Sequence, residues 1–188
     1  DLARAQAELN AGDAAMVDRK YEAAVTHFDS AAAALTALEQ RLTAVVGERL
    51  AAAQAAFAAG RAAEAQQKFT AVLAVAPDNA AARSGLARAR VLDDVLRATA
   101  EGATAEQAGQ PEAAMAAYQR ALQLDPASTV ARAGIERLRA RASGDAYSAA
   151  LSQAMAALAR RDYATAEAAF ERANRIRPGT AEVAEGLQ

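Results

Sequence analysis

The apolar residues recur at helical spacing, and one arrangement of them repeats along the chain. Residues 60–77, 109–126 and 161–178 superpose without a gap when each segment is aligned on its final proline. In every copy an alanine stands four positions before an aromatic residue, which places both side chains on one helix face. These pairs are Ala65 with Phe69, Ala114 with Tyr118, and Ala166 with Phe170. The pattern predicts three equivalent helices. In each of them the small alanine leaves space on the helix surface beside the aromatic ring, and we call this alanine position the notch.

A fourth copy and a partner helix extend the pattern. Residues 19–36 hold Ala24 and Phe28 in register and end on Thr36 in place of proline. Twelve positions before the four alanines stand further small residues: Gly12, Ala53, Gly102 and Ala154. Because small residues let two helices approach closely, we expect two helices in each unit, packed through these positions.

This arrangement resembles the tetratricopeptide repeat family, whose pattern is a helix-turn-helix with small residues at fixed places, an aromatic residue in the second helix and a terminal proline. The best matching motifs are residues 109–126 and 160–178. The resemblance covers most of the chain in four copies. The chain departs from the family pattern because it lacks tryptophan and because its four rings are 41, 49 and 52 residues apart, against about 34 in the standard repeat.

The resemblance implies an all-α fold, in which antiparallel hairpins with elongated first helices stack into a curved solenoid. We expect one domain over residues 1–188, with units at about 2–36, 37–77, 78–126 and 127–178. Residues 179–188 would begin a further, truncated unit, so we expect the natural protein to continue beyond Gln188.

The additional residues between units are themselves repeated. Gly85, Gly134 and Gly186 each stand eight positions after a proline. The pairs Asp78-Asn79 and Ser128-Thr129 supply capping side chains after two of these prolines. The sequence therefore predicts new helices that start there and run to about Ala108 and Arg160, each of roughly 29 residues.

Two turns are predicted with less support from glycine or proline. Residues 36–39 have the form of a capping box, so we place a turn there; one unbroken helix from Tyr21 to Ala59 is the alternative. The segment Ser143-Gly144-Asp145 is expected to break the second long helix, because it coincides with three residues by which that unit exceeds the one before it.

Composition and motifs argue against catalytic chemistry. The chain is 53% apolar and 4% aromatic, has a formal net charge of −2, and contains no cysteine that could form a disulfide or a thiolate site. His27 is its one histidine, so a histidine pair for metal is absent, and we expect a partly exposed structural residue. No glycine-rich phosphate-binding motif is present. We predict no enzyme activity, no catalytic, metal or cofactor-binding residue, and no cofactor.

The resemblance implies that the first helices line a concave groove that binds ligands. By register, the groove positions in this chain are Leu9, Met16, Leu50, Phe57, Leu96, Glu106, Leu151, Met155 and Leu158. Such an apolar groove suits a partner peptide or amphipathic helix. The alternative is that the lengthened helices cover these residues and make them core. The expected function is a non-catalytic protein-binding scaffold within a larger bacterial protein; a structural spacer, a self-assembly module and a regulatory appendage of an enzyme are the alternatives.

Arginine supplies an alternative binding surface. Arg83, Arg90 and Arg97 share a helix face, and Arg132, Arg137 and Arg139 repeat the placement of Arg83, Arg88 and Arg90. An anionic partner could bind a stripe formed by Arg83, Arg90, Arg97, Arg132 and Arg139. Interleaved acidic residues, the lack of nearby aromatic residues and the negative net charge argue against nucleic acid as that partner.

The two ends of the chain differ in the sign of their charge. Residues 1–60 hold eight acidic and five basic residues, whereas residues 127–178 hold nine basic and five acidic residues. This difference favours head-to-tail self-association.

The composition also suggests a source and a compartment. Lys20 and Lys68 are the only lysines among 21 basic residues, and alanine dominates, as in proteins from GC-rich bacteria. No apolar run reaches the roughly 18 residues of a membrane span. We expect a bacterial protein, in the cell envelope, periplasmic or membrane-tethered, in preference to the cytoplasm.

Overall fold

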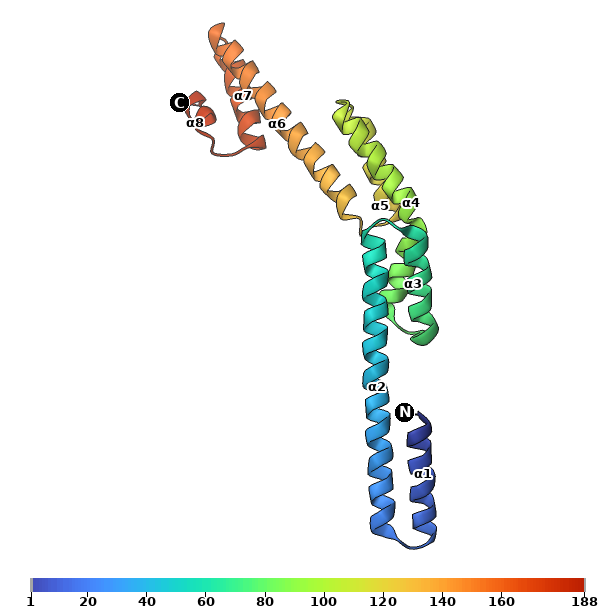
Figure 1. The fold of residues 1–188 in the computed structure, drawn as a ribbon. Coiled ribbons are helices and arrows are strands. Elements are labelled where there is room, and N and C mark those ends of the chain that lie inside the picture. Colours follow the sequence, from blue (N-terminus) through green and yellow to red (C-terminus); the bar gives the residue numbers. More distant parts are fainter. Residues whose placement is uncertain (1, 188) are drawn as a thin grey trace. The chain divides into compact units, whose positions relative to one another are not determined.

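The structure, a computed structural model, describes residues 2–187. Within these residues the chain forms eight helices and no strand, which confirms the all-α prediction (Figure 1). The helices are α1 (Leu2–Val17), α2 (Tyr21–Ala58), α3 (Ala62–Val75), α4 (Ala80–Gln107), α5 (Pro111–Leu124), α6 (Thr129–Ala159), α7 (Tyr163–Ile176) and α8 (Ala181–Gly186).

Long and short helices alternate in the way that the repeated segments predict. The ring-bearing helices α3, α5 and α7 have 14 residues each, whereas α4 has 28 and α6 has 31. The predicted caps are present: Asn79 Oδ1 accepts a hydrogen bond from the Ala82 amide at 2.9 Å, and Ser128 Oγ accepts one from the Ala131 amide at 3.4 Å. These side chains satisfy amide groups that have no partner inside the helix, which fixes where α4 and α6 begin.

The turn predicted at residues 36–39 is wrong. α2 runs for 38 residues without a break, so the alternative of one helix is confirmed. The Thr36 hydroxyl donates to the Ala32 carbonyl at 3.0 Å, a bond inside the helix, and therefore does not cap a new one. Residues 29–46 contain no glycine or proline, and alanine and leucine propagate a helix through a weak stop signal. α1 and α3 lie beside different ends of α2 (Figure 1).

The break predicted at Ser143-Gly144-Asp145 is also wrong, because α6 continues from Thr129 to Ala159. A glycine inside a helix costs only about 1 kcal/mol relative to alanine. Packing on both sides of Gly144 offsets this cost, since Leu138 and Tyr147 are both buried. The tertiary contacts of α6 therefore override the local signal for a turn.

The aromatic rings of the repeat are held against glycines of neighbouring helices. A Cβ atom added to Gly102 would lie 2.7 Å from the Tyr118 ring, and one added to Gly134 would lie 2.5 Å from its other edge. Tyr118 is thus enclosed between α4 and α6. Phe69 meets Gly85 in the same way. The predicted notch is confirmed, because the alanines four positions before these two rings, Ala65 and Ala114, are fully buried.

The contacts divide the chain into two compact units, residues 1–93 and 94–188, and each unit is described by itself. In the first unit the core gathers around Phe69 and contains residues from α2, α3 and α4: Ala53, Ala56, Ala65, Val72, Ala82 and Ala89. In the second unit one cluster surrounds Tyr147 and another surrounds Phe170. The division into four repeat units within one domain and their stacking into a curved solenoid stay predictions.

Candidate functional site

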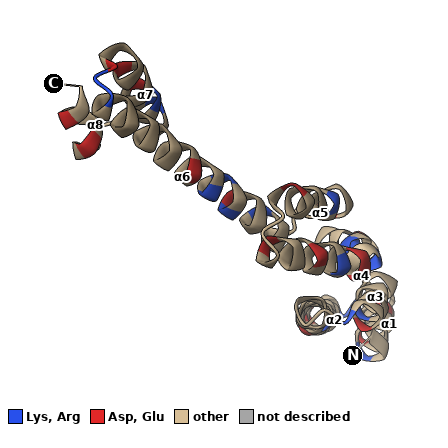
Figure 2. Ribbon diagram, turned by 90° about the horizontal axis from the view of Figure 1, so that it is seen from above, with Lys and Arg blue, Asp and Glu red and all other residues tan. Residues whose placement is uncertain are grey.

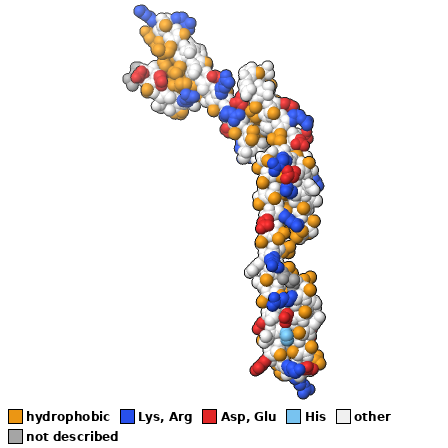
Figure 3. All heavy atoms as spheres, in the orientation of Figure 1, with side chains coloured by type: hydrophobic (Ala, Val, Ile, Leu, Met, Phe, Trp, Pro, Cys, Tyr) orange, Lys and Arg blue, Asp and Glu red, His pale blue; other side chains and the backbone are white. Residues whose placement is uncertain are grey.

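An apolar groove lies between α6, α7 and α8 in the second unit. Its volume is about 370 Å³, and its floor contains the ring of Phe170. Three predicted groove residues of α6 line it: Leu151, Met155 and Leu158. Met155 is 61% exposed and Leu158 is 36% exposed. Hydrophobic side chains gather on these C-terminal helices in Figure 3. The structure thus brings these three residues together; we call this site the α8 groove.

The short helix α8 forms one wall of the α8 groove and is fixed by two contacts. Val183 is buried against a cluster that includes Tyr147. The Tyr147 hydroxyl donates to Thr180 Oγ1 at 2.8 Å, at the residue that precedes α8. Gly186, the last residue of α8, lies so close to the Phe170 ring that a Cβ atom there would collide with it. These contacts place Glu182 and Glu185 of α8 along the groove opposite Met155.

An equivalent groove of about 390 Å³ occurs in the first unit, beside the ring of Phe69. It is lined by Gln54 and Phe57 of α2 and by residues of α4: Ala81, Ser84, Gly85 and Arg88. Phe57 stands twelve residues before its ring, as Leu158 does, and Gly85 stands sixteen after its ring, as Gly186 does. The same site therefore occurs in two repeats. We call this second copy the Phe57 groove.

An arginine from the next long helix contacts the residue that stands twelve before the ring. In the first unit the Arg88 guanidinium lies 4.7 Å from the centre of the Phe57 ring, a cation–π geometry. In the second unit Arg137 donates to both carboxylate oxygens of Glu106, at 3.2 and 2.9 Å. Both arginines stand nineteen residues after their ring. Their equivalent placement was visible in the sequence, but their reach across to a first helix was not.

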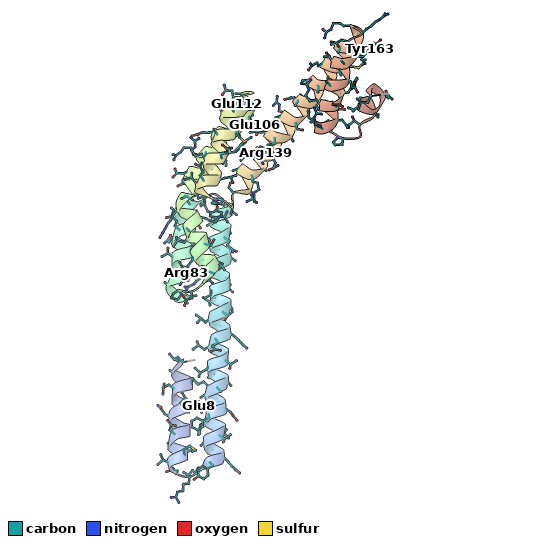
Figure 4. All side chains as sticks on the ribbon, turned by 180° about the vertical axis from the view of Figure 1, so that it is seen from behind. Glu8, Arg83, Glu106, Glu112, Arg139 and Tyr163 are labelled. Carbon is teal, nitrogen blue, oxygen red and sulfur yellow. The ribbon has the colours of Figure 1, made fainter. Side chains whose placement is uncertain are left out.

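Glu106 is the one acidic residue among the predicted groove positions, and it forms part of a hydrogen-bond network (Figure 4). The Tyr118 hydroxyl donates to Glu106 Oε2 at 2.9 Å. The hydrogen bond from Arg137, followed by that from Tyr118, holds the pKa of Glu106 below its ordinary value. Burial raises the pKa of Tyr118, and the Glu106 carboxylate acts in the same direction. A cavity of about 260 Å³ adjoins this network and is also lined by Leu138, Arg141 and Asp145.

Replacing Glu106 by glutamine is expected to weaken the acid dependence of stability. Since the folded pKa of Glu106 lies below its unfolded value, the contribution of the network is present above the ordinary pKa of 4.5 and is lost as the pH falls through the lowered pKa. The wild type should therefore lose more free energy of unfolding than Glu106→Gln between about pH 7 and about pH 3. Urea denaturation at the two pH values measures this difference. Glu112→Gln, on an exposed residue of α5, should behave as the wild type, and equal losses in all three proteins would contradict the assignment.

The other predicted groove positions are placed separately. Leu9 is half-buried and Met16 is exposed on α1. Leu50 packs against the core around Phe69, and Leu96 is exposed on α4. The three α6 residues and Phe57 line the two equivalent grooves, and Glu106 lines the adjoining cavity.

The predicted arginine stripe is divided between both units, and most of its members have a local partner. Arg83 pairs with Asp78 at 2.6 Å, Arg97 with Asp94 at 3.3 Å and Arg139 with Glu136 at 3.3 Å. Arg132 donates to the Pro126 carbonyl at 3.0 Å, and Arg90 is exposed on α4. These pairs partly neutralise the stripe, of which Arg83 and Arg139 are labelled in Figure 4. Anion binding by these residues stays a prediction.

His27 has the structural role that the sequence predicts. It is half-exposed on α2, and its Nδ1 lies 2.8 Å from Glu8 Oε2 of α1, which links the two helices of the hairpin. Across residues 2–187, no group of three or more histidine, cysteine or acidic side chains has an arrangement that could hold a metal ion. In the same part of the chain, no helix combines the length and the apolar character needed to cross a membrane.

A comparison with family models matches the segment that contains Ala65, the Phe69 ring and Gly85. The family model described as tetratricopeptide repeat matches residues 56–92, which contain α3, the Phe69 ring and Gly85. Residues 56–92 are similar to a tetratricopeptide repeat. The recognition made from the sequence is thereby confirmed for this segment, and the lengthened repeat stays a prediction. A comparison with curated proteins found no match. Tetratricopeptide repeats mediate protein–protein interaction, and the matched repeat contains Phe57 and Arg88 of the Phe57 groove.

Sequence reasoning did not select Glu182 and Glu185 as groove residues. Their signal lies in a comparison with residues 56–92, the segment that the tetratricopeptide repeat model matches. The equivalent positions there, twelve and fifteen residues after the ring, are Ala81 and Ser84. Glu182 and Glu185 thus give α8 two carboxylates at positions where α4 has small, uncharged side chains.

Proposed function

We propose that this chain is a non-catalytic protein-interaction scaffold that binds a peptide or helix of a partner through its apolar grooves. The single observation that carries this proposal is the recurrence of one groove in two repeats, with a ring as its floor and a first helix as its side. The tetratricopeptide repeat at residues 56–92 supports it, because such repeats serve protein interaction.

The α8 groove has the properties of a site for apolar side chains. Leu151, Met155 and Leu158 lie on one face of α6 with helical spacing, so together they match a partner helix that presents anchors at similar spacing. Burying an exposed apolar side chain stabilises a complex by roughly 1.5–3 kcal/mol when it becomes fully covered. Methionine adapts its shape to different partners, which suits Met155 at the centre of this surface.

The double variant Met155→Ser, Leu158→Ser is expected to lose partner binding by about tenfold or more, because two apolar contacts are removed from the groove. The measurement is affinity capture on the immobilised protein, followed by direct titration of the recovered protein. Circular dichroism should show unchanged helicity, since both side chains are exposed.

The matched control is Tyr163→Ser. Tyr163 is 67% exposed at the start of α7 in the same unit, and it lies outside the α8 groove (Figure 4). The control should bind the partner as the wild type does. Equal affinity of the double variant and the wild type for the recovered protein would contradict the proposal.

A further inference from the structure

One apolar face of α2 is exposed in the first unit. Tyr21 is 59% exposed, Val25 is 58% exposed and Leu35 is 38% exposed. Phe28 and Ala32 continue this row, in which the spacings are four, three, four and three residues, so the five side chains form one stripe along the helix. We call these five residues the α2 seam.

The ring of the α2 seam has a glycine at one edge. A Cβ atom added to Gly12 of α1 would lie 2.6 Å from the Phe28 ring, just as one added to Gly102 would lie 2.7 Å from the Tyr118 ring. Tyr118 has a second glycine at its other edge, Gly134 of the following long helix. Tyr118 is therefore 1% exposed, whereas Phe28 is only half-buried.

The unbroken helix α2 prevents the second contact. Gly85, Gly134 and Gly186 each stand sixteen residues after the ring that they contact, on the helix that follows it. The position sixteen residues after Phe28 is Ala44, which lies on the same helix as the ring. Sixteen helical residues span about 24 Å, so Ala44 lies far from the ring. The exposure of the α2 seam thus follows from residues inside the chain.

The covering helices of the other repeats show the shape that fits the α2 seam. Gln66 stands three positions before its ring, as Val25 does, and its Nε2 donates to the Ala89 carbonyl of α4 at 3.1 Å. α4 therefore extends along α3 beyond the contact of Gly85 with the Phe69 ring. A helix with glycine at the ring fits such a stripe, because glycine lets the two helices approach closely.

One side of the α2 seam is acidic. Glu22 and Asp29 each follow a seam residue by one position, so they lie along the same side of the stripe. Both side chains are exposed, and no ion pair or side-chain hydrogen bond among residues 2–187 includes either carboxylate. Ala24 and Ala31, on the other side of the stripe, are buried. A helix that covers the seam would therefore meet two carboxylates at its accessible side.

The helices that cover Phe69 and Tyr118 are rich in arginine. α4 carries Arg83, Arg88 and Arg90, and α6 repeats this placement. Basic residues mark both helices in Figure 2. A covering helix of the same kind has the charge opposite to that of the acidic side of the α2 seam.

We propose that the α2 seam binds a cationic amphipathic helix of a partner protein. This helix places a glycine against the open edge of Phe28, apolar side chains against Val25 and Leu35, and lysine or arginine beside Glu22 and Asp29. The apolar contacts supply most of the affinity, and the opposite charges select cationic over acidic helices. The α2 seam is a second binding surface, which shares no residue with the two grooves.

The probe is a labelled peptide with the sequence of residues 79–92, the cationic segment that covers Phe69 within the chain. Fluorescence anisotropy follows its binding to the complete chain. The double variant Val25→Ser, Leu35→Ser is expected to weaken binding at least about tenfold, because two exposed apolar contacts are removed. Circular dichroism should show unchanged helicity in this variant, since both side chains are exposed.

The matched control is Leu42→Ser, Val45→Ser. It changes the same two residue types at exposed positions of α2 outside the α2 seam. The control should bind the peptide as the wild type does. Equal affinities of the wild type and the Val25→Ser, Leu35→Ser variant, or equal losses in that variant and the control, would overturn the proposal.

A second peptide tests the charge selection. Its substitutions Arg83→Glu, Arg88→Glu and Arg90→Glu should weaken binding at least about tenfold. In the chain variant Glu22→Lys, Asp29→Lys the preference between the two peptides should reverse. It should also shrink in the wild type as the salt concentration rises, because exposed charges are screened.

The control for charge is the chain variant Glu48→Lys, Asp93→Lys. It changes the net charge by the same amount in the same unit, at exposed acids of α2 and α4 outside the α2 seam. This control should keep the preference for the arginine peptide. A complete loss of preference here would show that overall charge makes the selection, and the proposal would fail.

A third peptide, with Gly85→Leu, tests whether the helix lies against the Phe28 ring. Its leucine side chain would hold the helix away from the ring, so binding should weaken at least about tenfold. Unchanged binding of this peptide would show that the open edge of Phe28 is not the docking point, which contradicts the proposal.

Two further measurements decide whether this chain is itself the occupant. The chain should be monomeric by light scattering; self-association that Val25→Ser, Leu35→Ser abolishes would show that a second copy covers the seam. Ala44→Leu should leave the peptide affinity unchanged, and tighter binding would show that residue 44 competes for the ring. Either of these contrary results overturns the proposal. Neither bears on the proposed function, which depends on Met155 and Leu158.

Discussion

Replacing Phe69 by alanine is expected to lower the free energy of unfolding by about 3–5 kcal/mol, the range found for large aromatic side chains in close-packed cores. Phe69 is 2% exposed and belongs to the core cluster that joins α2, α3 and α4. Its removal would leave a cavity that the backbone at Gly85 cannot fill, because glycine has no side chain. Urea denaturation followed by circular dichroism measures the loss.

The matched control for this variant is Tyr21→Ala, which removes an exposed ring from the start of α2 in the same unit. Its effect should stay within about 0.5 kcal/mol, as for surface substitutions in general. Comparable losses in the two variants would mean that the ring of Phe69 is not the centre of the packing.

Replacing Gly85 by alanine is expected to destabilise the protein by about 1–3 kcal/mol, although alanine is the better helix former. The reason is steric: a Cβ atom at Gly85 would lie less than 3.0 Å from the nearest atom of the Phe69 ring, so the buried ring would have to move out of its packed position. The same substitution at Gly47 of α2 should have the opposite sign. No atom lies within 4 Å of a Cβ placed there, so Gly47→Ala should stabilise the protein by about 0.5–1 kcal/mol.

Urea denaturation of the two alanine variants tests this difference in sign. A second substitution adds a sharper test: Phe69→Leu should cost less in the Gly85→Ala background than in the wild type, because a smaller side chain relieves the collision. Additive effects of Gly85→Ala and Phe69→Leu would show that the two positions do not contact each other. Destabilisation by Gly47→Ala would show that α2 has a neighbour at Gly47.

The ring and its notch could be predicted from the sequence because they depend on spacing within one helix. An alanine and a ring four residues apart must share a helix face, whatever surrounds them. The buried Ala65 and Phe69 confirm this reasoning. The caps at Asn79 and Ser128 were predictable for a similar reason, since each side chain binds an amide only three residues further along the chain.

The two turns were not predictable from local signals because helix continuation competes with them. A capping motif at Thr36 and a glycine at position 144 each change the local free energy by about 1 kcal/mol. Contacts elsewhere along α2 and α6 are worth more than this, and helix formation is cooperative. In α2, where residues 32–52 include no buried side chain, the outcome follows from helix propensity and cooperativity. In α6 it follows from tertiary packing, which the spacing of residues in one segment does not contain.

The candidate site was predictable only in part. Leu151, Met155 and Leu158 followed from the register of the first helices, and the structure places all three in one groove. Glu182 and Glu185 reach the groove from another helix, and their position depends on how Val183 fixes α8. Such contacts between separate helices require the packing angle of α8 as well as its sequence.

The central claim is that the α8 groove is an open binding surface, held in shape by the buried rings. The methionine methyl NMR spectrum tests it most directly, because the chain has three methionines and one of them, Met155, lines this groove. On addition of the partner protein recovered by affinity capture, the Met155 methyl resonance should shift while those of Met16 on α1 and Met115 on α5 stay in place. An unchanged Met155 resonance at a saturating concentration of that protein would contradict the account.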